Sequence, residues 1–216
     1  MDGPLVNLNS SNTVQILLLV GAVTLIPAVL FTVTGFSRIL IVLGFIRSAI
    51  GTTNAPPNQV LVGIALFLTI FVMAPTVSAI KKDAFDPLTS HKISTTTALV
   101  RAEQPLREFM FRQTRTQDIS LFISLAHAKV PHKRSEVPTE VLVPAFIVSE
   151  LKTAFQIGFL IFLPFLIIDL IVSATLMSMG MIMLPPTFIS LPFKILLFVL
   201  VDGWDLVIKA LVQSFH

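Results

Sequence analysis

The chain has 216 residues, of which 54% are apolar and only 12% are charged, and its mean hydropathy is +0.88. Because a soluble domain carries about 25% charged residues, this composition indicates a membrane protein. The formal net charge of +3 is too small to suggest nucleic-acid binding. The chain has no cysteine, which excludes disulfides, thiol nucleophiles and thiolate metal sites.

Residues 1–80 form the first region, in which we expect apolar helices. The stretch that leads up to Arg38 and the stretch after Arg47 are each long and apolar enough for a helix that crosses a hydrocarbon core, which takes about 20 such residues. The polar residues before the first apolar run include no lysine or arginine, so we expect a retained helix rather than a signal peptide. The proline pair Pro56 and Pro57 predicts the turn between the helices.

Residues 81–140 carry more than half of the charged side chains, and we expect a small water-facing helical insertion there. Pro105 suits the first turn of one amphipathic helix, and a second is predicted after Asp118. The positive-inside rule favours a cytoplasmic position for Arg38 and Arg47, which have no acidic neighbour, and therefore the opposite side of the membrane for the insertion.

Residues 141–216 are apolar nearly to the end of the chain, and the proline pair Pro185 and Pro186 predicts the turn of a further helical hairpin. The pattern as a whole predicts an all-α protein of apolar helical hairpins with a charged helical insertion. It contains no nucleotide-binding glycine loop, nucleophile elbow or histidine pair at metal-ligand spacing, since His127 and His132 are five residues apart and read as solvated. We therefore expect no enzyme activity, no cofactor and no metal site.

Four methionines alternate with other residues just before the second proline pair: Met177, Met179, Met181 and Met183. A period of two does not fit one face of a helix. One interpretation is adaptable packing inside a bundle, because the methionine side chain is unbranched and fills irregular gaps. The other is a flexible apolar loop that closes a pore when several copies surround it.

The few charges of this last region are the second candidate feature, because ionisable groups at membrane depth are costly and pair or face a cavity. Asp205 and Lys209 are four residues apart and could pair within one helix. Glu150 and Lys194 could pair only across helices or across subunits. Asp169 has either a structural partner or a proton-carrying role, and the second option leaves open a small secondary transporter or proton channel.

Three segments, in this order, resemble the FliP family, the P subunit of the bacterial flagellar type III export gate, and are also similar to its injectisome counterpart SctR. The resemblance covers nearly the whole chain. Its motifs are the following: residues 35–43 with 56–60, residues 144–159, and residues 191–194 with 201–204.

The resemblance implies a non-enzymatic subunit of a ring-like or helical oligomer. Five copies would assemble with the R and Q subunits, and alongside the B-type export-switch subunit, into a closed cone that passes unfolded flagellar proteins. It implies the bacterial inner membrane and the flagellar basal body, with much of the assembly, the insertion included, on the periplasmic side. An assembly scaffold without a conduit is a third interpretation, in which the methionines only pack.

The resemblance also implies roles for individual residues. Met181, Ile182 and Met183 fall in the methionine loop that closes the channel, and Ile182 departs from the three consecutive methionines often found there. A β-branched side chain is stiffer at χ1, so the seal is expected to be less adaptable. Charged contacts between subunits are implied as well, for three residues: Glu150, Lys194 and Arg115.

Overall fold

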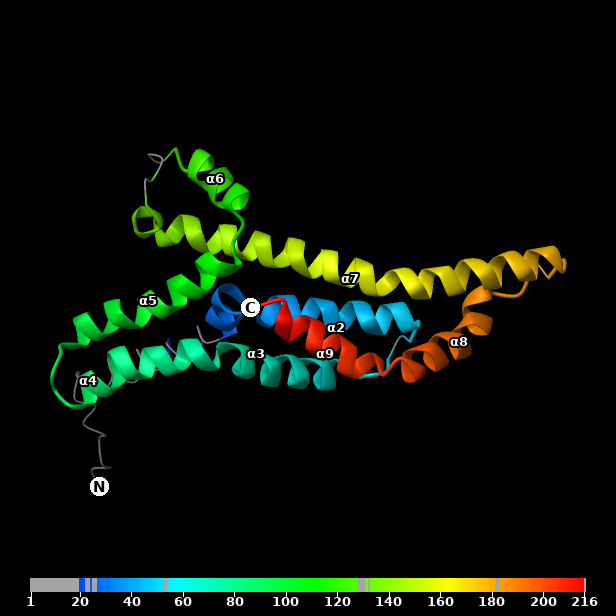
Figure 1. Ribbon diagram of the computed structural model, residues 1–216, viewed down its shortest axis with the longest axis horizontal. Coiled ribbons are helices and arrows are strands. Elements are labelled where there is room, and N and C mark those ends of the chain that lie inside the picture. The colour runs from blue at the N-terminus through cyan, green and yellow to red at the C-terminus, as the bar shows by residue number, and fades with distance from the viewer. Residues whose placement is uncertain are drawn as a thin grey trace, which may run out of the picture.

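The computed structural model describes residues 20–21, 24, 27–52, 54–127, 131, 133–181 and 183–215. In these ranges the chain is helical and contains no strand, which confirms the predicted all-α class. Helix α7 (Thr139–Ser178) runs along the length of the molecule, and α2, α5, α6 and α8 pack against it (Figure 1).

Helix α2 (Phe36–Ile50) forms the centre of the core and lies along α7. The two helices approach closely at Gly158, whose Cα faces the Phe45 ring so tightly that a Cβ would lie 2.4 Å from it. A helical segment, Pro27–Val33, precedes α2 at an angle of 82°. Part of the apolar run predicted before it lies outside the described residues.

The first proline pair separates two helices, as predicted. Helix α2 ends at Gly51, which has a φ of +89°, a left-handed conformation that glycine adopts without strain. Helix α3 (Asn58–Ile80) begins directly after Pro57. A proline at this position loses nothing, because the first N–H groups of a helix have no intrahelical partner.

The charged region continues α3 through a π-helical turn, Lys81–Phe85, into the short α4 (Asp86–Thr89). Helix α5 (Thr95–Gln113) then returns toward α7, and α6 (Thr116–Leu125) packs on the outer side of α7 (Figure 1). A last 3₁₀ turn, Arg134–Glu136, precedes α7.

The prediction that a helix begins near Pro105 is wrong, because α5 begins ten residues earlier in the sequence and Pro105 lies inside it. The Ser94 hydroxyl accepts a hydrogen bond from the Thr97 N–H, which caps the true N-terminus. An internal proline removes one backbone hydrogen bond. The apolar contacts of Phe109 and Met110 in the core keep α5 continuous despite that loss.

The predicted second hairpin is confirmed. Helix α7 ends at the methionines, Pro185 stands at the N-terminus of α8 (Pro186–Leu200), and α8 packs back against α7. Helix α9 (Gly203–Gln213) follows, and the end of the chain lies beside the start of α2 (Figure 1).

Two continuous helical stretches, Asn58–Thr89 and Thr139–Ser178, are long and apolar enough to cross a membrane. The segment Pro27–Val33 and helix α2, which are bent relative to each other, could together form a third span. Most of their apolar surface is not covered within one chain. Large apolar side chains stand outward on α3, α7 and α8, and faces of this kind are stable only against lipid or other protein. Examples are Phe67, Ile70, Phe71, Phe159, Leu170 and Phe188.

Candidate functional site: buried ion pairs and the methionine loop

Arg38 and Glu150 form a buried ion pair between α2 and α7. Both residues are 1% exposed. The Arg38 Nε donates to Glu150 Oε2 at 3.0 Å, and an Arg38 Nη donates to Glu150 Oε1. This is the bidentate geometry in which a guanidinium recognises a carboxylate with two parallel hydrogen bonds.

The remaining donors of Arg38 bind the end of the chain and α5. Its Nη1 donates to the Ser214 carbonyl at 2.8 Å and to the Ser214 hydroxyl at 3.0 Å, and its Nη2 donates to Gln113 Oε1 at 3.0 Å. The Phe215 ring covers the guanidinium, with 3.9 Å from Cζ to the ring centroid. Gln113 in turn donates to the Phe215 carbonyl at 2.9 Å. One arginine therefore ties three helices to the C-terminal turn.

The second ion pair joins α7 to α8. Lys194 Nζ lies 2.6 Å from Asp169 Oδ2, and the Ser190 hydroxyl donates to Asp169 Oδ1 at 2.6 Å. Ser190 and Lys194 are buried and one helical turn apart, so both reach the same carboxylate. Nζ also lies 3.7 Å from the position that a Cβ on Gly51 would take, which places the ammonium at the C-terminus of α2, where the helix dipole favours a cation.

A third polar cluster holds α6 on α7. The Ser149 hydroxyl accepts a hydrogen bond from the Arg115 N–H at 3.1 Å and donates to Asp118 Oδ2 at 2.6 Å, while Lys152 binds Asp118 Oδ1. Burial raises the pKa of Asp118, but the hydrogen bonds from Lys152 and Ser149 and the positive charges of Lys152 and Arg115 outweigh it, so the pKa is lowered overall. The Arg115 guanidinium also donates to Gln156 Oε1 at 2.6 Å.

The structure thus gives each of the predicted charged residues a partner within the same chain. Glu150 and Lys194 do not pair with each other, because each has a different partner on a different helix. Asp169 has Lys194 as an ion-pair partner, as its structural interpretation requires, and the predicted pair between Asp205 and Lys209 is confirmed, with charged atoms 2.6 Å apart. Contacts of Glu150, Lys194 and Arg115 with other subunits stay predictions.

Arg38 is the central residue of the first ion pair, and the sequence analysis assigned it no partner. Its partner is 112 positions away, and no local pattern reports such a pairing. The available signal was its place at the start of the apolar run of residues 39–43, since a cation beside so apolar a stretch requires a counterion.

The four methionines surround the turn that joins α7 to α8. Gly180, with a φ of +75°, donates to the Met177 carbonyl at 3.0 Å, and the Met181 N–H donates to the Leu176 carbonyl at 2.9 Å, which closes α7. None of the four side chains is part of the core: Met177 is 68% exposed, Met179 71%, Met181 39% and Met183 99%. Ile182 lies outside the described residues, so only two of the three predicted gasket positions can be placed.

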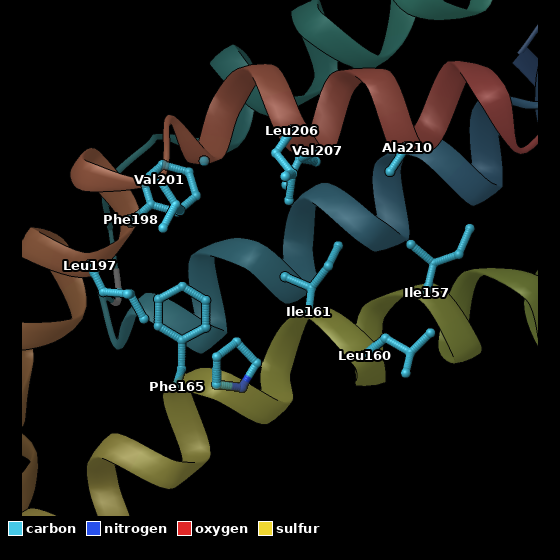
Figure 2. A pocket seen from close by; sticks show the side chains of 12 residues that line it. Ile157, Leu160, Ile161, Phe165, Leu197, Phe198, Val201, Leu206, Val207 and Ala210 are labelled. Carbon is cyan, nitrogen blue, oxygen red and sulfur yellow. The ribbon is translucent and has the colours of Figure 1, made fainter.

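An apolar groove of about 450 Å³ runs between α7, α8 and α9 (Figure 2). All its lining residues are apolar, among them Ile161, Phe165 and Phe198, so it offers no acid, base or nucleophile. Among the residues that the structure describes, no three His, Cys, Asp or Glu side chains lie together as metal ligands would.

These features define a class of protein: a helical membrane protein in which buried ion pairs hold the helices together. Its apolar faces are not covered within one chain and require contact with lipid or other subunits. The comparisons with known proteins narrow the class. The model of the FliP family matches residues 19–211, and the chain belongs to this family, whose members are components of the flagellar export apparatus.

Three relatives, each named flagellar biosynthetic protein FliP, show the extent of the similarity. The chain is 56% identical to that of Bacillus subtilis (strain 168) over 207 residues, which are 96% of this chain and 94% of the relative. It is 45% identical to that of Aquifex aeolicus (strain VF5), over 96% of this chain and 88% of the relative. It is 54% identical to that of Buchnera aphidicola subsp. Baizongia pistaciae over 94% of this chain, but it spans only 56% of that relative.

Proposed function

We propose that several copies of this chain, five by the family resemblance, form a gated conduit for unfolded flagellar proteins in the bacterial inner membrane. The copies assemble with the R and Q subunits of the export gate and act beside the B-type export-switch subunit. The extended apolar faces of α3, α7 and α8 support this proposal, because a single chain leaves them uncovered.

The observation that carries the proposal is the methionine loop. Met181 and Met183 stand outward at the tip of the α7–α8 hairpin, and Gly180 gives the tip its sharp turn. A ring of such tips places flexible thioether side chains around one axis. Unbranched methionines adapt their shape, so the ring can seal against ions and part around a passing polypeptide.

The three regions take separate roles in this proposal. Residues 1–80 and 141–216 supply the apolar helices of the conduit wall, and residues 81–140 form the insertion on the periplasmic side. The supporting feature is charge: Arg47, on α2, has no acidic neighbour in the sequence, whereas the insertion holds most of the charged side chains.

Charged residues contribute to assembly in two ways under this proposal. Arg115 is only half-buried, so its guanidinium is available to a neighbouring subunit as well as to Gln156. Glu150 and Lys194 are committed to Arg38 and Asp169, and they support contacts between subunits by fixing the helices that carry the apolar faces.

The test is the ion conductance of membranes that contain the assembled gate. The double substitution Met181→Ala and Met183→Ala is expected to raise conductance while the native mass of the complex with the R and Q subunits stays the same. Leu99→Ala, which truncates an exposed apolar side chain of α5 away from the loop, is the matched control. An assembled double variant with unchanged conductance contradicts the seal and supports an assembly scaffold without a conduit.

A further inference from the structure

The methionines that the structure describes fall into two groups. Met177, Met179, Met181 and Met183 expose between 39% and 99% of their surface around one turn, whereas Met73 and Met110 are buried in the core, with 5% and 2% exposed. One chain therefore has four exposed thioethers around one turn, and its two buried methionines serve as controls for the effect of exposure.

Exposed thioethers react with hydroperoxides such as hydrogen peroxide. The sulfur lone pair attacks the outer peroxide oxygen, the S–O bond forms as the O–O bond breaks, and the leaving oxygen takes up a proton to give water or an alcohol. The sulfur loses two electrons and the peroxide gains them, so the step is balanced without a metal or cofactor. Accessibility of the sulfur decides which methionines react first.

We propose that the methionine loop is a site of oxidative modification, and that hydroperoxides convert Met183 and its exposed neighbours to methionine sulfoxide. The consequence for permeability rests on the proposed seal. A sulfoxide is polar, so it holds water where the thioether excluded it. Oxidation therefore opens the seal to ions, and enzymatic reduction of the sulfoxide closes it again.

The loop lies apart from the contacts that hold the helices together, so its oxidation affects permeability and not the fold. No described methionine supports the ion pairs at Arg38 and Asp169, and the buried pair Met73 and Met110 belongs to the core of the chain. Oxidation at the loop thus changes the polarity of one exposed tip while the contacts that fix the helices stay in place.

The first experiment treats the assembled complex with hydrogen peroxide and maps the products by peptide mass spectrometry. Each sulfoxide adds about 16 Da, and the peptide containing Met183 is expected to gain this mass about tenfold faster than the peptides containing Met73 and Met110. Equal rates at Met183 and the two buried methionines overturn the proposal.

The second experiment follows ion conductance during the same treatment. Conductance is expected to rise severalfold and to fall again after addition of a methionine sulfoxide reductase. A variant with leucine at the four loop positions keeps the apolar character and cannot be oxidised there, so its conductance should not respond. If the full variant fails to assemble, Met183→Leu alone is used, and its response should be smaller than that of the unchanged protein because the most exposed thioether is gone. A response of the same size in the leucine variant overturns the proposal.

The two proposals fail in distinguishable ways. If the seal does not exist, Met181→Ala with Met183→Ala leaves conductance unchanged, and so does peroxide, although Met183 is still oxidised faster than Met73. If the seal exists but the loop is shielded from oxidants, the alanine variant leaks, and Met183 reacts no faster than Met73.

Discussion

The guanidinium of Arg38 and the carboxylate of Glu150, 112 residues apart in the sequence, meet in two hydrogen bonds inside the protein. Both groups are removed from water, and the remaining guanidinium donors are used by Gln113 and Ser214. A buried pair of this quality is costly to break, because removing one partner leaves the other charged and unpaired. The pair therefore fixes how α2, α5, α7 and the C-terminal turn meet.

Glu150→Ala is expected to destabilise the protein by about 3–5 kcal/mol, because it leaves the Arg38 guanidinium buried without a counterion. The measurement is thermal or denaturant unfolding in detergent. Asp205→Ala breaks an exposed pair with Lys209 and is the control, with an expected cost of about 0–1 kcal/mol. Equal losses in the two variants would show that burial of the Arg38 pair has no energetic consequence.

Double-mutant cycles should separate the two buried ion pairs. We expect Arg38 and Glu150 to be coupled, and Asp169 and Lys194 to be coupled, each by about 0.5–3 kcal/mol, because the members of each pair are in contact. Substitutions at Glu150 and Lys194 are expected to be additive, since neither residue contacts the other within the chain. Strong coupling between Glu150 and Lys194 in the assembled complex, absent in the isolated chain, would show that they meet across a subunit boundary.

The pH dependence of the free energy of unfolding should show the ionisation of the Asp118 carboxyl group. Its pKa is lower in the folded protein than the unfolded value of about 3.9, so the ionised carboxylate stabilises the fold above that value and loses its effect as pH falls through the folded pKa. Unfolding of the protein and of Asp118→Asn is compared from neutral to acidic pH. The stability advantage over the variant should be constant near neutrality and shrink below about pH 3.9.

A control variant separates this effect from the loss of a negative charge. Glu108→Gln removes an exposed carboxylate of α5, and its difference from the unchanged protein should remain small at every pH. If the advantage over Asp118→Asn instead grows as the pH falls, the pKa of Asp118 is raised by burial and the hydrogen bonds from Lys152 and Ser149 do not control it.

Local features of the structure followed from the sequence because their causes are local. Proline pairs end and begin helices through the chemistry of one residue, so the turns at Pro57 and Pro185 were predicted. The pairing of Asp205 with Lys209 follows from the helical repeat alone. The start of α5 differs from the prediction because the hydroxyl of Ser94 caps a helix that begins ten residues before Pro105 and contains it.

The partners of Arg38, Glu150 and Lys194 could not be predicted in this way. Each ion pair joins helices whose relative placement depends on the packing of the whole core, and helical periodicity describes only neighbours within one helix. The methionine loop is an intermediate case, because its turn is local, but the exposure of its side chains depends on where α8 packs against α7.

The last prediction distinguishes a structural Asp169 from one that carries a proton. If Asp169 is structural, Asp169→Asn should reduce export of flagellar proteins because it leaves the buried Lys194 without its counterion. The double variant Asp169→Leu with Lys194→Met replaces both charges by apolar side chains and should recover much of the loss, since well-packed apolar pairs can replace buried ion pairs. Secretion of flagellar subunits into the medium measures both variants. A double variant that assembles normally, yet exports no more than Asp169→Asn, would instead favour the secondary transporter or proton channel, because both variants lack the carboxylate.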